Sequence, residues 1–462
     1  MAKINKTLNE LKEVLSSEEI EEIKLERFST KAGIKLWVLF NQVTDPRVIG
    51  RSKYPLGEVL LLVFFAVLAG ANTWVDIAAY GESKLKLLRK ITEYTHGTPS
   101  HDEIRYIFGL IDPLEFQNVV MNFLRDNIQH LRKCMHLTDP GPDAYRHWAI
   151  DGKEERGTGR HYNTRIGGKV RNIQTLHVWD ATDEICIYSE KIDEKTNEIP
   201  VAQRFLRSQD TLENTLITCD ALHTQKVTTQ IIIKKDGDYV LGLKGNQTGL
   251  LEDATAYFDE DTLKAIRDSE VDYYTETEKA HSQIEKREYF LVRPEPDSER
   301  DKEWSGISSY VCCRKTITPL DGSQATVETR YYVASIDDIR LCASAIRQHW
   351  FCECGHWHLD HSSKEDENTT MDSNAFENLS LFFKIILALL KILKVTPEYK
   401  GDSINTIRKK FAWNSEENLK HLFGIIDKDV MERTINDNKL SKKKKDHANK
   451  LLKDMTWNPI NV

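Results

Sequence analysis

The sequence predicts an α/β protein in which a helical N-terminal region precedes a mixed sheet with helices on its faces. Up to about residue 135, apolar residues recur at helical spacing. From residue 147 the apolar runs shorten to strand length, and farther on such runs alternate with helical stretches. This order of segments is typical of an α/β sheet covered by helices.

The helical region is predicted to contain four helices, over residues 57–69, 74–88, 100–110 and 113–132. Ser100 is the expected N-cap of the third helix, and Glu103 completes a capping box. Pro113 suits the first turn of the fourth helix, because the N–H that it lacks would have no partner there. We therefore expect a helical domain over residues 45–137, preceded by an arm over residues 1–44.

The breaker cluster Asp139-Pro140-Gly141-Pro142 marks a boundary after which strands begin. Strands are expected over residues 147–151, 172–180, 184–192, 214–219 and 239–244, with helices over residues 200–207, 225–235 and 249–258. These segments form the first part of a core, over residues 142–270. Further strands over residues 283–292, 306–315 and 324–333 predict a β-rich insertion at 271–336. The last part of the core, 337–396, includes a buried helix at 375–393, and a polar, basic tail covers 397–462.

Composition limits the classes of partner. The 462 residues carry a formal net charge of −8 and the pI is 6.1, which argues against a wholly basic nucleic-acid binder. A local basic face stays compatible with this balance, because distant charges are screened. The start of the chain shows no secretory signal, and the longest apolar run, about residues 59–69, is too short to span a bilayer. The eight cysteines follow no disulfide framework, so we expect reduced thiols, a cytoplasmic location and no membrane partner.

Three acidic residues form the most informative pattern. Asp151 and Asp220 each end a short apolar run, and Glu353 lies in a segment with helical spacing. Two carboxylates at strand ends and one from a helix can converge on a pair of divalent cations, which activate a hydroxyl in phosphodiester chemistry. Mg²⁺ suits such oxygen ligands. An ordinary strand-end aspartate is the competing interpretation, and spacing alone does not rank Asp180, a third strand-end aspartate, below the others.

A polar stripe surrounds the third acid. His349, Glu353, His356 and Asp360 follow at steps of four, three and four residues, so on one helix they share a face. The two histidines are candidates to orient a scissile phosphate or, when protonated, to neutralise developing charge. A solvated helix face is the alternative. A zinc site is disfavoured, because a helix sends Cys352 and Cys354 to different faces and no second cysteine pair has ligand spacing.

Basic residues near the acids are candidate contacts to DNA phosphates. They lie in a glycine-rich segment that contains Lys153, Arg156, Arg160, Arg165, Lys169 and Arg171. Contacts of this kind position DNA without reading its sequence. Lys244 and Asn246 are further candidates at a strand end, with helix capping as the alternative. The lysine run at residues 442–445 has the composition of a solvated tail.

Five stretches carry a family resemblance: Ala149-Ile150-Asp151-Gly152-Lys153, Asp193-Glu194-Lys195-Thr196-Asn197-Glu198-Ile199-Pro200, Thr218-Cys219-Asp220-Ala221, Leu243-Lys244-Gly245-Asn246-Gln247, and Ile346-Arg347-Gln348-His349-Trp350 followed by Glu353. With Asp45-Pro46-Arg47 and the helical region after it, they resemble insertion-sequence DDE transposases close to the H-repeat-associated proteins of Rhs elements. The resemblance covers about residues 45–425.

The resemblance implies an RNase H-like core with a β-rich insertion before the last acid. It implies Asp151, Asp220 and Glu353 as the catalytic, metal-binding triad and a structural role for Asp180. The implied cofactor is a pair of Mg²⁺ ions, with Mn²⁺ as the other candidate. The implied activity is cleavage of transposon-end DNA and strand transfer into target DNA. Double-stranded DNA and a second copy of the chain on it are the expected partners, at the nucleoid of a bacterial cell.

The chain departs from the family pattern near the expected DNA path. Cys354 stands where the branch has asparagine, and Thr369 and Met371 stand where arginines are expected. These changes leave the acids intact and remove positive charge. They favour the alternative of a decayed or repurposed transposase that binds DNA without cutting it. A metal-dependent nuclease without strand transfer is a third interpretation.

Overall fold

The structure is a computed structural model that describes residues 36, 39–121, 145–419 and 422, apart from 49, 51, 90, 164–167, 194, 281, 295–301, 322 and 397. Most of the expected N-terminal arm and the lysine run at 442–445 lie outside these residues. The chain divides into two compact units. Unit 1 comprises Met1–Thr138, Glu155–Asn172 and Trp357–Val462, and unit 2 comprises Asp139–Glu154 and Ile173–His356.

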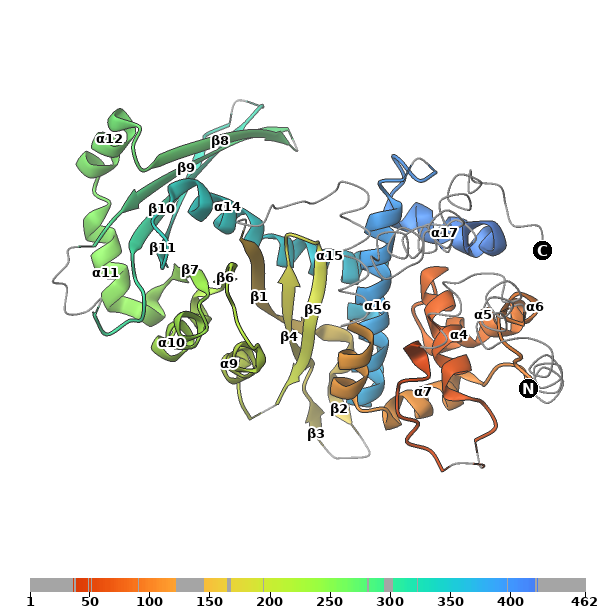
Figure 1. The fold of residues 1–462 in the computed structure, drawn as a ribbon. Helices are drawn as coiled ribbons and strands as arrows, with labels where there is room; N and C mark the ends of the chain where they lie inside the picture. Colours follow the sequence, from red (N-terminus) through yellow and green to blue (C-terminus); the bar gives the residue numbers. More distant parts are fainter. Residues whose placement is uncertain are drawn as a thin grey trace, which may run out of the picture. The chain divides into compact units, whose positions relative to one another are not determined.

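Unit 1 is built mainly from helices in its described part (Figure 1). These are α4 (Leu56–Leu68), α5 (Trp74–Ser83), α6 (Leu85–Leu88), α7 (His101–Leu110), α16 (Ser373–Leu393) and α17 (Ile404–Trp413), beside the second half of α15 (Phe351–Ser362). The short strands β2 (Arg160–Asn163) and β3 (Gly168–Val170) pair antiparallel, and single 3₁₀ turns occur at η1 (Arg156–Thr158) and η4 (Glu365–Glu367).

Aromatic packing around α16 forms the core of unit 1. Phe382 lies 5.5 to 5.9 Å, centroid to centroid, from Phe40, Phe108 and Phe116. The Asn378 side chain donates to the carbonyls of Phe108 (2.8 Å) and Ile111 (3.0 Å), so it satisfies the end of α7. This explains why α16 is apolar nearly all round, since it is buried along its length.

Unit 2 is organised by a nine-stranded mixed sheet with the order β5-β4-β1-β6-β7-β11-β10-β9-β8 (Figure 1). The first five are β1 (Arg146–Glu155), β4 (Ile173–Asp180), β5 (Ile185–Ile192), β6 (Thr215–Cys219) and β7 (Asp238–Leu243). β6 runs parallel to both β1 and β7, and β4 runs antiparallel to β5. The mixed α/β fold expected from the sequence is confirmed at this level.

The two faces of this sheet pack against different helices. One face, including Ile217 and Leu241, packs against α9 (Glu198–Ser208), α10 (Lys226–Lys234), α11 (Thr248–Tyr257) and α12 (Glu260–Ser269). The other face, including Leu216 and Val240, packs against α14 (Ile339–His349) through residues such as Ala345. Successive residues of β6 and β7 thus alternate between two cores, because side chains alternate along a strand.

The predicted β-rich insertion continues the same sheet. Its strands are β8 (Tyr273–Ala280), β9 (Gln283–Val292), β10 (Ser309–Pro319) and β11 (Thr326–Ala334). They form an antiparallel meander, and β11 pairs with β7 from Tyr331↔Leu243 to Ala334↔Val240. The edge of β7 is therefore covered by pairing and not left exposed.

Several local predictions differ from the structure. The single helix expected over 74–88 is two, because it breaks at Lys84 between α5 and α6. β8 and α12 were not predicted, since both are mostly polar and charged. Ser100 is the N-cap of α7, as expected, and accepts a hydrogen bond from the Glu103 N–H. Among the described residues, no helix has the length and apolar character needed to cross a membrane.

The packing of α15 on the sheet gives a test of the fold. At Gly355, an added Cβ would lie 2.5 Å from the Trp179 indole, which is buried in β4. We expect Gly355→Ala to lower the free energy of unfolding by about 1–2 kcal/mol, because overpacking outweighs the helix propensity that alanine gains. Urea denaturation measures this. The control is Gly245→Ala, where the added Cβ meets nothing within 4 Å. Equal stability of the two variants would contradict the packing.

Candidate active site

Asp151 and Asp220 lie together because β1 and β6 pair in parallel. The register sets Ile150 opposite Cys219, so Asp151 and Asp220, the next residues, are neighbours across the two strands. Asp220 directly follows β6, whereas β1 continues to Glu155, so the expectation that Asp151 ends its strand was wrong. Asp220 is the residue before the 3₁₀ turn η2 (Ala221–His223), and the Lys244 ammonium lies 3.8 Å from its carboxylate. This juxtaposition is what the spacing of the two apolar runs led us to expect.

The carboxylate of Asp151 lies in a crowded negative environment. Burial raises the pKa of Asp151 to about 7, with further increases from the carboxylates of Asp220, Glu198 and Glu353. The hydrogen bond from the Gly152 N–H (2.9 Å) acts in the opposite direction. Negative charge concentrated at a strand edge favours the binding of a cation.

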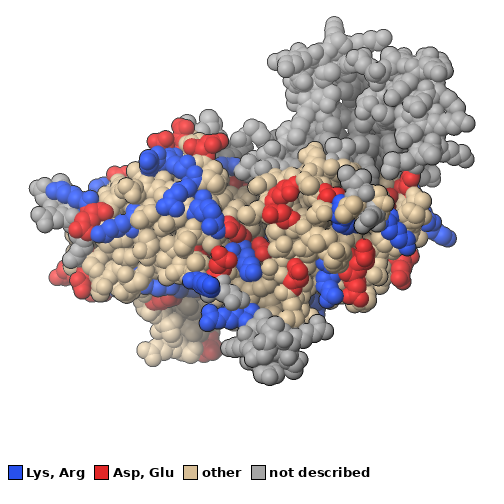
Figure 2. Space-filling view, turned by 90° about the horizontal axis from the view of Figure 1, so that it is seen from below, with Lys and Arg blue, Asp and Glu red and all other residues tan. Residues whose placement is uncertain are grey.

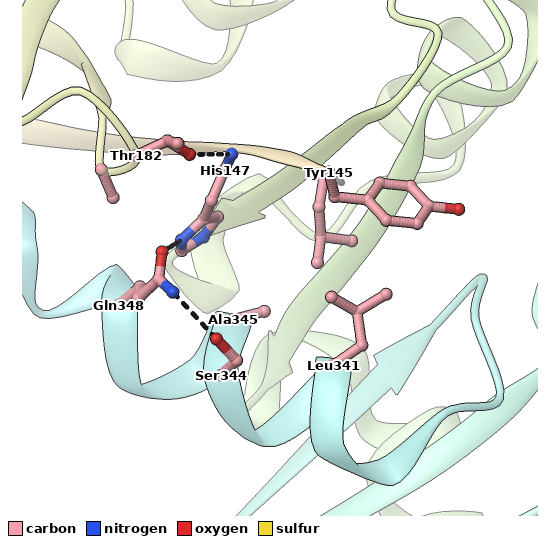
Figure 3. A pocket seen from close by; sticks show the side chains of 9 residues that line it. Tyr145, His147, Thr182, Leu341, Ser344, Ala345 and Gln348 are labelled. Atoms are coloured by element: carbon pink, nitrogen blue, oxygen red, sulfur yellow. Dashed lines mark hydrogen bonds between the residues drawn. The ribbon is translucent and has the colours of Figure 1, made fainter. Parts of the chain in front are cut away.

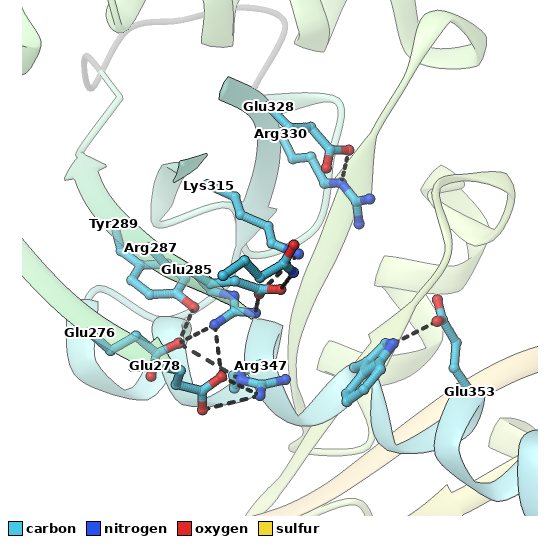
Figure 4. Close-up of polar contacts among 12 residues, drawn as sticks. Glu276, Glu278, Glu285, Arg287, Tyr289, Lys315, Glu328, Arg330, Arg347 and Glu353 are labelled. Carbon is cyan, nitrogen blue, oxygen red and sulfur yellow. Dashed lines mark hydrogen bonds and ion pairs between the residues drawn. The ribbon is translucent and has the colours of Figure 1, made fainter. Parts of the chain in front are cut away.

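Glu353 is exposed on the first turn of α15 and is tied to the end of α14. The Trp350 indole N–H donates to Glu353 Oε2 at 2.6 Å, and the Arg347 guanidinium lies over the Trp350 ring, 5.4 Å from its centroid. Arg347 also pairs with Glu278 of β8 at 3.0 Å (Figure 4). The strands after β7 thereby support the position of the third acid.

The first half of α15 is placed by β4. Gly355 allows close contact with Trp179, and His356 Nε2 lies 2.9 Å from Nδ1 of the buried His177. The other ring nitrogen of His356 faces Asp151 Oδ2 at 3.7 Å. His356 therefore lies beside the acids, as its position in the stripe suggested.

The polar stripe does not lie on one helix. The chain turns at Trp350, so His349 ends α14 while Glu353 and His356 belong to α15. Asp360 belongs to unit 1, where its potential ligand atoms lie near those of Glu155 and Glu365. The expectation that the four residues share one helix face was wrong. The sequence has no glycine or proline at Trp350 to signal that one helix ends there and another begins.

Two buried histidines, His147 and His349, form a relay on the α14 side of the sheet. His147 lines a small pocket together with Gln348 (Figure 3). Burial lowers the pKa of His147 to about 3 and that of His349 to about 4, so both are neutral at pH 7. Thr218 Oγ1 lies 2.8 Å from His147 Nε2 and 2.9 Å from His349 Nδ1. The other nitrogen of His147, Nδ1, lies 3.1 Å from Gln348 Oε1.

The relay fixes the tautomers. Gln348 Oε1 can only accept, because the Gln348 amide group donates to Ser344 at 2.8 Å, so His147 carries its proton on Nδ1. Thr218 then donates to His147 and accepts from His349 Nδ1–H. His349 Nε2 remains an acceptor, which does not favour the alternative that a protonated His349 neutralises developing charge.

Asp180 lies away from this group. Its carboxylate accepts from the N–H groups of Thr182 and Asp183 and lies 3.7 Å from Arg146, at the start of β1. It stabilises the turn after β4. The structural role implied for it agrees with these contacts.

The residues predicted to contact DNA phosphates differ in exposure: some are on the surface and others are buried or already hydrogen-bonded. Lys153 is buried, with 8% exposed, which does not favour a role as a phosphate contact. Arg156 is exposed and lies 3.9 Å from Asp366, and Lys244 is exposed beside Asp220. Asn246 donates to the Ala221 carbonyl at 2.7 Å, so its amide holds the loop that follows Asp220. The side chain of Arg160 lies outside the described residues.

The surface charge is mixed. In Figure 2, Lys and Arg side chains lie interspersed with Asp and Glu over the described part of the face seen from below. This agrees with the formal net charge of −8. DNA contact would therefore depend on local basic residues and not on a uniformly basic face.

The geometry bears on which groups can hold a metal ion. Among the described residues, the one group of three or more potential ligand side chains whose ligand atoms all lie within 4.8 Å of one another is Glu155, Asp360 and Glu365 in unit 1. The ammonium of the buried Lys384 already lies 3.7 Å from Glu365. Asp151, Asp220 and Glu353 do not meet that distance, yet Asp220 and Glu353 both act electrostatically on Asp151, and all three supply the oxygen ligands that suit Mg²⁺.

Sequence reasoning missed Glu198, the first residue of α9. Its carboxylate Oε2 lies so close to Gly152 that a Cβ there would be 1.9 Å away. The only sequence signal was its place within the stretch Asp193–Pro200 that carries the family resemblance.

Comparison with known proteins defines the class. A family described as DDE_Tnp_1-associated matches residues 37–124. The chain is 31% identical over 367 residues to "H repeat-associated putative transposase YhhI" of Escherichia coli K12, covering 78% of this chain and 91% of the relative. It is 30% identical over 378 residues to "Putative transposase YncI" of Escherichia coli O157:H7, covering 81% and 90%.

These matches identify a transposase, as the sequence motifs predicted. In particular, the chain belongs to the H repeat-associated transposase family. A solved piggyBac transposase synaptic complex with hairpin DNA aligns with 91% of this chain and 85% of that one, at 12% identity and a TM-score of 0.34.

The raised pKa of Asp151 predicts a pH dependence of stability. In the unfolded chain this carboxyl ionises near 3.8 and in the folded chain near 7, so ionisation destabilises the fold as pH rises between these values. Without divalent ions, Asp151→Asn should be more stable than wild type by about 1–3 kcal/mol at pH 8 and by much less at pH 4. Urea denaturation at both values measures this. Asp268→Asn, at an exposed position of α12, is the control. A pH-independent difference would contradict the crowding of charge.

Removing the hydroxyl of the relay gives a second test. Thr218→Val keeps the side-chain shape and leaves His147 Nε2 and His349 Nδ1 buried without their shared partner. We expect a loss of about 1–3 kcal/mol in the free energy of unfolding, measured by urea denaturation. In ¹⁵N-edited NMR spectra, the imidazole nitrogens should no longer show one fixed tautomer each. Unchanged imidazole shifts would show that the relay does not exist.

Proposed function

We propose that this chain is a DDE transposase that cleaves transposon-end DNA by metal-assisted hydrolysis and joins the freed 3′-hydroxyl to target DNA. One observation carries the proposal: Asp151 and Asp220 follow paired residues of the parallel strands β1 and β6, with Glu353 close enough to raise the pKa of Asp151. Membership of a transposase family supports the same activity.

We also propose that the core of unit 2 is RNase H-like. The order β5-β4-β1-β6-β7, with parallel pairing of β1, β6 and β7 and antiparallel pairing of β4 and β5, supports this. Asp220 directly follows β6 and Asp151 is its neighbour on β1, near the carboxyl ends of parallel strands, where ligands bind in open α/β sheets.

Asp151, Asp220 and Glu353 would hold two Mg²⁺ ions, or Mn²⁺ in their place. When bound, this pair supplies activation of the attacking oxygen and charge stabilisation on the leaving oxygen. Oxygen-only donors and the excess negative charge at Asp151 fit such ions.

The remaining residues would orient the reacting groups. His349 Nε2 can accept a hydrogen bond, so it suits the O–H of a water or 3′-hydroxyl. His356 lies between His177 and Asp151 and holds the side chain of that acid in place. Lys244, exposed beside Asp220, is the basic residue best placed to contact a phosphate of the bound strand.

The proposed substrate is double-stranded DNA in the bacterial cytoplasm, and Arg156 and Lys244 are its exposed basic contacts. Bringing two transposon ends together would require a second copy of the chain, so we expect a homodimer on DNA. Thr369 and Met371 stand where the family has arginines, which favours the alternative of a DNA-binding protein without cleavage activity. The retained acids oppose that alternative.

Amide substitution of the triad tests the activity. Asp151→Asn, Asp220→Asn and Glu353→Gln should each lower Mg²⁺-dependent cleavage by about a thousandfold or more, because each removes several kcal/mol of transition-state stabilisation. Binding should change little. The substrate is labelled linear DNA that ends in the terminal repeats flanking the gene, and affinity is measured by gel shift.

The matched control is Glu252→Gln, at an exposed position of α11, which should cleave at the wild-type rate. Wild-type protein that binds the ends yet cuts nothing with Mg²⁺ or Mn²⁺ would overturn the proposal in favour of the non-cleaving binder.

A further inference from the structure

A fourth acidic side chain approaches Asp151 from a separate element. Glu198 is the first residue of α9, and the Asn197 side chain caps that helix by accepting from the Ile199 N–H at 3.1 Å. The cap fixes where α9 begins and therefore where the Glu198 side chain starts. None of the residues assigned above to the metal centre comes from this helix.

The backbone beside Asp151 leaves room for the Glu198 carboxylate. A Cβ at Gly152 would lie 1.9 Å from Glu198 Oε2 and 3.0 Å from its carboxyl carbon, so no larger residue fits there while Glu198 stays in place. Gly152 directly follows Asp151 in β1, so the Glu198 carboxylate lies against the main chain one residue beyond the predicted metal ligand, on the face toward which a Gly152 Cβ would point. The glycine in this motif is thus explained by an acid that is distant in sequence.

Electrostatics agree with this closeness. Glu198 raises the pKa of Asp151 more than Glu353 does, although Glu353 is the acid of the triad. The pKa of the buried Cys219 thiol, at the end of β6, is also raised. Burial is the largest cause, followed by the carboxylates of Asp220, Asp151 and Glu198. When ionised, Asp151 and the three acids around it, Asp220, Glu198 and Glu353, would carry a formal charge of −4, which two divalent cations neutralise.

A buried histidine points at the same carboxylate. His223 ends the turn η2 after Asp220, has 0% exposed surface, and its Nε2 lies 3.6 Å from Glu198 Oε2. Neither ring nitrogen of His223 has a hydrogen-bond partner among the described residues. A buried imidazole that faces a carboxylate from just beyond hydrogen-bond distance is typical of an outer-shell partner. It can form its hydrogen bond when the carboxylate shifts to bind a metal ion.

A purely structural ion pair between His223 and Glu198 is the competing explanation. The 3.6 Å separation is too long for a hydrogen bond, and the Glu198 side chain keeps 21% of its surface exposed, close to the 25% of Asp151. A carboxylate devoted to a buried partner would be closed off, whereas this one stays partly exposed to solvent.

We propose that Glu198 is a fourth metal-binding carboxylate, which shares a divalent ion with Asp151, and that His223 is a positioning residue behind it. The inference rests on the proposed function, because it adds a ligand to the same centre. It also assigns Gly152 the role of admitting Glu198 to that centre.

The test measures metal binding apart from DNA cleavage. The full-length chain is titrated with Mn²⁺ at pH 7.5 without DNA, free Mn²⁺ is followed by its EPR signal, and thermal unfolding is recorded on the same samples. Glu198→Gln should weaken Mn²⁺ affinity about tenfold or more, and it should lose most of the rise in Tm that Mn²⁺ gives the wild type. Glu198→Asp, which keeps the charge but withdraws the oxygens, should fall between the two.

Glu252→Gln is the matched control and should bind Mn²⁺ as the wild type does. If Asp151→Asn loses Mn²⁺ binding while Glu198→Gln retains wild-type affinity, this inference fails and the proposed function stands. A lower metal-free Tm of Glu198→Gln with unchanged affinity would establish the structural ion pair with His223 instead. If the wild type binds no Mn²⁺, the proposed function itself fails.

Discussion

The parallel pairing of β1 and β6 is the constraint on which the site depends. It sets Ile150 opposite Cys219 and so makes the two aspartates that follow neighbours across the two strands. Like charges in a half-buried place are costly unless a cation or a proton compensates. In this fold, burial and the neighbouring carboxylates raise the pKa of Asp151 to about 7, so its ionised form is destabilised. α15 and the strands β8 to β10 then bring or hold further side chains beside the two aspartates.

Two neighbouring parts of unit 2, α15 and the strands β8 to β10, position the side chains around Asp151 and Asp220. α15 lies against β4 because Gly355 has no side chain to displace Trp179, and this brings Glu353 and His356 to the acids. The strands β8 to β10 carry an ion-pair network in which Arg287 and Arg347 share Glu278, and Arg347 continues to Trp350 and Glu353 (Figure 4). The strands that extend the sheet therefore also support the third acid, so a long β segment can stand between Asp220 and Glu353 in the chain while both act on Asp151.

The sequence predicted what local patterns determine. Apolar runs of strand length gave β1, β4, β5, β6 and β7 to within a few residues, and the acids that follow these runs were visible as candidates, although β1 continues four residues beyond Asp151. The family motifs then ranked Asp151 and Asp220 above Asp180. What was missed depends on contacts between distant segments. Glu198 reaches Asp151 only because α9 docks beside Gly152, and the break at Trp350 depends on how α14 and α15 meet different strands. Burial also affects protonation: the sequence left the charge of His349 open, and in the fold burial lowers the pKa of its imidazole to about 4.

The central claim is that the crowded carboxylates of unit 2 form a divalent-metal centre. Anomalous diffraction from crystals of the full-length chain soaked in MnCl₂ tests it most directly, because each bound Mn²⁺ gives a peak at its own position. The account predicts peaks within about 2.5 Å of carboxylate oxygens of Asp151 and Asp220, with Glu353 turned toward them. Manganese found only at Glu155, Asp360 and Glu365, the acidic group of unit 1, would contradict it.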